Sequence, residues 1–135
     1  MNVVKVVSTY LVTTTVFVAI DMAWLGFVAR DFYRRQLGPL LARQVNWPAA
    51  IAFHLLFIAG ILTFVVYPAI EKNSFRRAVA LGGLFGLVTY ATYDLTNLAT
   101  LPGFPPIVVA VDLVRGIVIT GTVSTVGFLV ARKIG

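Results

Sequence analysis

Four long apolar stretches, separated by short polar breaks, constrain the fold of this chain more than any other feature of the sequence. A helix rises about 1.5 Å per residue, so roughly 20 apolar residues cross the ~30 Å hydrocarbon layer of a membrane. Only 12% of the residues are charged, whereas a soluble domain carries about 25%. The sequence therefore predicts one all-α domain, an integral membrane four-transmembrane-helix bundle. We expect its helices at about residues 3–29, 48–70, 78–98 and 106–130.

The first apolar stretch differs from a secretory signal peptide. The apolar core of such a peptide spans about 7–15 residues and ends at a small-residue cleavage site. This stretch is longer, contains Asp21 and ends in Trp24-Leu25-Gly26. We therefore expect it to be retained as a membrane-spanning helix.

The first loop is basic and amphipathic. Tyr33, Leu37, Leu40 and Leu41 recur at three- and four-residue steps, which predicts a short interfacial helix within residues 31–45. The net charge of +6 would suggest a nucleic-acid ligand in a soluble protein. Here the basic residues lie at helix ends, where membrane topology and lipid head groups account for them. We expect the lipid bilayer as a partner and no nucleic acid.

The distribution of Lys and Arg predicts the orientation. With four helices, both termini and the middle loop lie on one side of the membrane, and the remaining two loops lie on the other. Six basic residues fall on the first side and four on the second, which favours cytoplasmic termini in a bacterial inner membrane. The first set is Lys5, Lys72, Arg76, Arg77, Arg132 and Lys133, and the second is Arg30, Arg34, Arg35 and Arg43.

Polar residues recur at one depth of the predicted bundle. Asp21 lies late in the first helix, His54 early in the second, Asp94 late in the third and Asp112 early in the fourth. Because successive helices run in opposite directions, all four lie toward the same side, about 6–9 Å from the midplane. The candidate binding residues are Asp21, His54, Tyr90, Asp94, Asn97, Asp112 and Arg115.

Two interpretations of this cluster stay open. Three aspartates and one arginine leave an excess of two negative charges if every acid is ionised, and such charges are costly in low dielectric. The cluster could therefore bind a proton or a cation, with His54 as a group that titrates near neutrality. Alternatively, Asp112 could pair with Arg115 along one helix, and the remaining polar groups could hold the helices together through hydrogen bonds.

Several chemistries lack their usual residues. The chain has no cysteine, so it has no disulfide and no thiolate site, and it has no histidine pair at metal-binding spacing. We expect no metal and no cofactor, and no catalytic residue is identified. Gly82, Gly86 and Gly116 are predicted to allow close helix packing. A homodimer through Gly82 and Gly86, or through Gly116 and Thr120, is one interpretation of these small faces.

The motifs resemble those of a known family. They are D-x-x-W-L-G from Asp21, Y-x-x-Y-D-L-T-N from Tyr90 to Asn97, and Asp112-x-x-x-Gly116. In these motifs the chain resembles a bacterial family of predicted four-helix membrane proteins, a domain of unknown function, over nearly its whole length. The resemblance implies membrane residence and no particular chemistry.

Three functions are consistent with these observations. The first is binding, and also translocation, of a proton, a cation or a small polar solute at the polar cluster. The second is an accessory or structural subunit that docks to a larger membrane complex through its small-residue faces. The third is a membrane enzyme that acts on a lipid head group, with Asp94 or His54 as general base.

Overall fold

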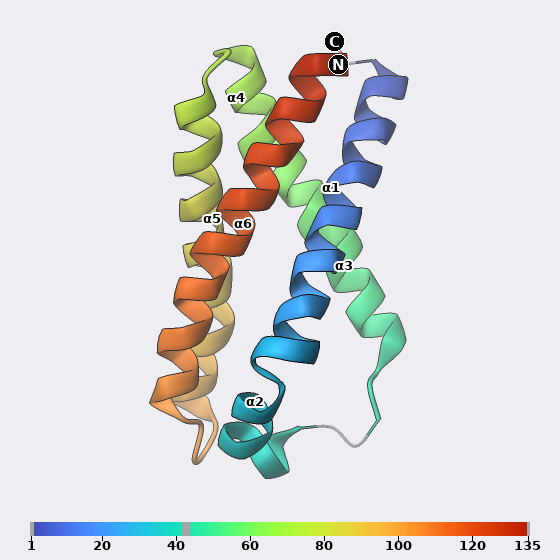
Figure 1. Cartoon of the computed structure of the whole chain (residues 1–135). Helices are drawn as coiled ribbons and strands as arrows, with labels where there is room; N and C mark the ends of the chain where they lie inside the picture. Colours follow the sequence, from blue (N-terminus) through green and yellow to red (C-terminus); the bar gives the residue numbers. More distant parts are fainter. Residues whose placement is uncertain (1, 42–43, 135) are drawn as a thin grey trace.

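The computed structural model describes residues 2–41 and 44–134 and shows an all-α membrane bundle (Figure 1). Four helices are long and apolar enough to cross a membrane: Val3–Val28, Trp47–Glu71, Phe75–Thr100 and Pro106–Ile134. No strand occurs in the described parts of the chain. The predicted fold class is therefore confirmed.

The first two spans each contain a π-helical turn. Helix α1 (Val3–Ala23) continues into the turn Trp24–Val28. Helix α3 (Trp47–Ile61) continues through the turn Leu62–Val66 into α4 (Tyr67–Glu71). The π-helical turn Leu62–Val66 has a local cause. Pro68 has no N–H to donate to the helix, and its ring crowds the preceding turn.

The third span, α5 (Phe75–Thr100), begins earlier than the hydropathy pattern suggests. Ser74 is its N-cap, and the Ser74 side chain accepts a hydrogen bond from the Arg77 backbone N–H at 3.2 Å. Asn73 adopts a φ of 46°, a left-handed conformation that asparagine tolerates and that reverses the chain after α4. The polar residues before the apolar segment thus add the first turn of the helix.

The fourth span, α6 (Pro106–Ile134), forms its most extensive contact with α5. Three glycines allow this contact. A Cβ atom at Gly82 would lie 2.7 Å from Ser124 Cβ, and a Cβ atom at Gly86 would overlap the Gly116 carbonyl group. The small faces that the sequence offered for a homodimer therefore face each other within one chain.

The helices run alternately up and down, with both termini at the same end as the α4–α5 turn (Figure 1). The apolar core includes Phe17, Ile58, Ile61 and Val123. Toward Trp47, α3 slants away from the other helices (Figure 1).

A short helix, α2 (Arg30–Leu37), lies at the opposite end from the termini. Its apolar side packs through Tyr33 against Phe104, just before α6, and against Val108 and Val109 at the beginning of α6. Gly38, with a φ of 38°, ends the helix, and a 3₁₀ turn over Gly38–Leu40 follows. The topology count also used Arg43, which lies outside the described residues.

Candidate functional site

The centre of the candidate site is Arg115 on α6. Its guanidinium group lies 3.7 Å from an Asp112 carboxylate oxygen one turn earlier on the same helix. It also lies 3.4 Å from an Asp21 carboxylate oxygen on α1. All three side chains are largely buried, with Asp21 5% exposed and Asp112 7% exposed. Arg115 therefore forms ion pairs with two buried acids, one on α1 and one on α6.

Tyr33 connects α2 to this ion-pair group. Its hydroxyl group donates a hydrogen bond to the Asp112 carboxylate. The Tyr33 hydroxyl oxygen also accepts hydrogen bonds, from Arg115 at 2.9 Å and from the Trp24 indole N–H at 3.3 Å. Burial, together with the hydrogen bond to Asp112, raises the pKa of Tyr33 to about 12. The hydroxyl therefore remains protonated, and remains a donor, throughout the physiological range.

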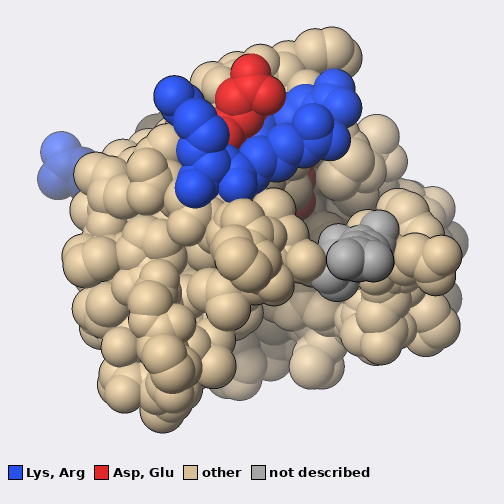
Figure 2. Space-filling model, turned by 90° about the horizontal axis from the view of Figure 1, so that it is seen from below, with Lys and Arg blue, Asp and Glu red and all other residues tan. Residues whose placement is uncertain are grey.

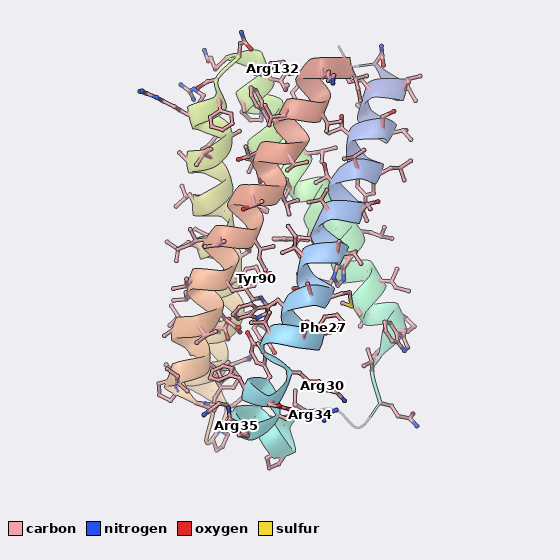
Figure 3. All side chains as sticks on the ribbon, viewed as in Figure 1. Phe27, Arg30, Arg34, Arg35, Tyr90 and Arg132 are labelled. Carbon is pink, nitrogen blue, oxygen red and sulfur yellow. The ribbon has the colours of Figure 1, made fainter. Side chains whose placement is uncertain are left out.

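Arg115 is also held by two aromatic rings. Its guanidinium carbon lies 5.3 Å from the centre of the Tyr90 ring and 5.7 Å from the centre of the Tyr33 ring. Cations are attracted to the faces of such rings within about 6 Å. Tyr90, labelled in Figure 3, lies on α5 in the half of the bundle nearer α2. Residues from α1, α2, α5 and α6 thus fix one guanidinium group.

His54 on α3 faces the Asp21 carboxylate. Its Nδ1 lies 2.7 Å from the Ala50 carbonyl oxygen, which only accepts hydrogen bonds, so Nδ1 carries a proton. The other ring nitrogen, Nε2, lies 3.9 Å from Asp21 Oδ2. In a neutral imidazole Nε2 would then be an acceptor facing another acceptor.

Asp94 on α5 is the least satisfied group of the site. Its side chain is 0% exposed, and no hydrogen-bond donor reaches either of its carboxylate oxygens. Its carboxyl group is close enough to that of Asp112 for the two to interact electrostatically. Two ionised carboxylates only accept hydrogen bonds, so neither acid can satisfy the other while both are ionised.

A cavity of about 270 Å³ connects these groups. It lies between α1, α3, α5 and α6. Four charged side chains line it: Asp21, Asp94, Asp112 and Arg115. Five aromatic rings also line it: Phe17, Phe53, Phe57, Tyr90 and Tyr93. The cavity is therefore acidic at its base and aromatic on its walls.

The structure brings most of the sequence-predicted residues together. Five of them line the cavity: Asp21, Tyr90, Asp94, Asp112 and Arg115. His54 does not line the cavity but faces one of these five, Asp21. Asn97 does not line the cavity. It is partly exposed, and its backbone carbonyl accepts the Leu101 N–H at 2.8 Å.

Tyr33 and Trp24 were not predicted as site residues. Each gave a sequence signal, since Trp24 follows Asp21 by three residues and so shares its side of a helix. Tyr33 lies on the apolar side of an amphipathic segment, where its hydroxyl group requires a partner. The sequence does not show that α2 folds back toward the start of α6.

Among the described residues, no group of three or more His, Cys, Asp or Glu side chains could hold a metal ion. The acids of the site are held by Arg115 and Tyr33 or face each other.

The fold and the cavity define an integral membrane protein of four spans with a buried acidic site. The chain belongs to the family described as "Predicted membrane protein (DUF2177)", whose family model matches residues 6–129. The resemblance suggested by the sequence motifs is thereby confirmed at the level of the family. No curated protein and no solved structure matches the chain.

Proposed function

We propose that this protein binds a proton, a cation or a small polar solute in the acidic cavity of the bundle. The observation that carries the proposal is the Asp94 carboxyl group, which is 0% exposed and has no donor for either oxygen. A buried carboxylate without donors costs several kcal/mol, whereas a protonated or cation-bound one costs less.

The charge balance supports this proposal. Asp21 and Asp112 share Arg115, and Asp94 adds a further negative charge next to Asp112. With all three acids ionised, 3 − 1 leaves two excess negative charges in a region of low dielectric. A proton on the Asp94–Asp112 pair, or a cation in the cavity, reduces this excess.

The geometry supports binding more directly than passage across the membrane. The cavity lies in one half of the bundle. In the other half, packed side chains such as Ile58, Ile61 and Val123 fill the interior, and each of these three is 0% exposed. Translocation would require these helices to separate. Binding requires no change in the helix arrangement.

The test compares the thermal unfolding of wild type and Asp94→Asn in mild detergent across pH and added cations. Asparagine keeps the size of the side chain and removes its charge. We expect wild-type stability to depend on pH or on the cation, by about 2.7 kcal/mol at a hundredfold excess over Kd, and the variant to lose this dependence. Glu71→Gln is the matched control, because Glu71 is an exposed acid at the far end of the bundle. Identical responses of wild type and Asp94→Asn would contradict the proposal.

A further inference from the structure

The donor that Asp94 lacks indicates the chemistry of the ligand. Arg115 contacts Asp21 and Asp112, and Tyr33 donates to Asp112, so these two acids already have partners. Asp94 has none for either oxygen and lines the cavity. A ligand that places a positively charged N–H donor there would form charge-assisted hydrogen bonds, which are about twice as strong as neutral ones.

The cavity is shaped for an organic cation rather than for a bare ion. Its volume of about 270 Å³ is far larger than the ~30 Å³ that one water molecule occupies in the liquid. Aromatic rings line its walls, and such rings attract ammonium groups through cation–π interactions. One ring, Tyr90, already holds Arg115 in this way. An ammonium group attached to a carbon skeleton satisfies both the acid and the walls.

The cavity opens sideways, toward the surroundings of the helices. Phe53 on α3 is 50% exposed and Tyr93 on α5 is 62% exposed, although both line the cavity. Phe53 belongs to the part of α3 that slants away from the other helices (Figure 1). A ligand that enters between α3 and α5 reaches Asp94 from the membrane, not only from water.

Exposed arginines at the same end of the bundle as the cavity add a second requirement. Arg30, Arg34 and Arg35 on α2 are exposed, and none has an acidic partner within 4 Å in the described parts of the chain. Figure 2 shows basic side chains, with an acidic group between them, forming an arc along one edge of a hollow at this end, and Figure 3 places the three labelled arginines there. This arc repels a free cation and attracts a phosphate.

We propose that the ligand is a zwitterion that carries an ammonium group and a phosphate a few bonds apart, the chemistry of an ethanolamine phospholipid head group. The ammonium group binds Asp94 between the aromatic walls, and the phosphate meets the arginines of α2. Tyr33 couples the two parts, because it lies on α2 and contacts both Asp112 and Arg115. This inference rests on the proposed function and specifies the ligand of the same cavity.

The test measures retention of added phospholipids on the full-length protein by native mass spectrometry, with the thermal midpoint as a second readout. The lipids are phosphatidylethanolamine and phosphatidylglycerol, which share the phosphate and differ in the ammonium group. We expect wild type to retain the ethanolamine lipid about tenfold more strongly, a difference of about 1.4 kcal/mol. Asp94→Asn should abolish this preference, and Arg34→Gln should weaken binding of both lipids. Glu71→Gln and Arg76→Gln, at the opposite end of the bundle, should change neither.

Further measurements distinguish a lipid from a free solute as the source of the zwitterion. They also distinguish failure of this inference from failure of the proposed function. Soluble phosphoethanolamine that raises the thermal midpoint as much as the lipid would support the head-group chemistry and assign it to a free solute. Equal retention of both lipids, unaffected by Asp94→Asn, would overturn the zwitterion, while a pH or cation response that depends on Asp94 would keep the proposed function. An Asp94→Asn variant identical to wild type in every arm would overturn both.

Discussion

The hydroxyl group of Tyr33 holds together groups from three separate segments of the chain. It donates to Asp112 and accepts from Arg115 on α6, and it accepts from Trp24 in the π-helical turn after α1. Because a hydroxyl group has one donor and two acceptor sites, these three bonds use its full capacity. Tyr33 therefore determines how α2 covers the acidic end of the bundle.

We predict that Tyr33→Phe destabilises the protein by about 1–3 kcal/mol, since Asp112 loses its donor and Arg115 loses an acceptor in a buried site. Thermal or denaturant unfolding in detergent measures the loss. Tyr10→Phe is the matched control, because the Tyr10 hydroxyl group bonds the Leu55 carbonyl oxygen rather than a carboxylate. Equal losses in both variants would show that Tyr33 makes only an ordinary hydrogen bond.

The same residue predicts a pH dependence in alkaline solution. The pKa of Tyr33 is about 12 in the folded protein, against 10.0 without its surroundings. Between these values the folded state keeps the phenol proton while the unfolded chain releases it. The stability that Tyr33 contributes is thus fully present below pH 10 and is lost as the pH rises through 12. Unfolding measured from pH 8 to pH 12 should show a steeper decline for wild type than for Tyr33→Phe, and parallel curves would contradict this prediction.

At the scale of elements, the contact of α5 with α6 depends on glycines that leave no room for a methyl group. We predict that Gly86→Ala destabilises the bundle by about 1–3 kcal/mol, because its Cβ would overlap the Gly116 carbonyl group and force the helices apart. Gly83→Ala is a control on the same helix, since its Cβ would lie 3.6 Å from Ile117 Cγ2, an ordinary contact. Equal unfolding midpoints for the two variants would show that the helices can separate at little cost.

The elements differ in how far the sequence could define them. The four spans follow from hydropathy, because each apolar residue contributes its own transfer free energy. The alternation of direction then places Asp21, Asp94 and Asp112 at one level, as rigid helices preserve depth. The extra turn at the start of α5 depends on the Ser74 cap, and the hydropathy pattern does not include it.

The part of the site that comes from α2 required the structure. Tyr33 reaches Asp112 only because α2 turns back along the start of α6, and that return depends on packing between residues far apart in sequence. Asn97 shows the opposite case. It shares a helical stripe with Tyr90 and Asp94, yet the cavity ends before it. Helical spacing gives the side of a helix but not the extent of the cavity along it.

At the scale of the whole molecule, the two ends of the bundle carry different sets of basic residues. The end with the termini carries Lys72, Arg76 and Arg77 in addition to basic residues at both chain ends, and the other end carries the arginines of α2. The larger number favours cytoplasmic termini. The acidic cavity and α2 would then lie toward the outer side of the membrane, and a lipid ligand would come from the outer leaflet.

We predict this orientation for the protein in the inner membrane of a bacterial host, and cysteine labelling tests it without background because the chain contains no cysteine. Gln36→Cys on α2 and Glu71→Cys at the end of α4 are exposed positions at opposite ends of the bundle, and neither change alters the count of basic residues. An impermeant maleimide should label the first variant in intact cells and the second only after permeabilisation. The reverse pattern would place the cavity on the cytoplasmic side, and labelling of both variants in intact cells would show a mixed orientation.

Because the positive-inside bias depends on so few residues, Arg76→Gln combined with Arg77→Gln should raise the fraction of inverted molecules, whereas Arg30→Gln combined with Arg34→Gln should not.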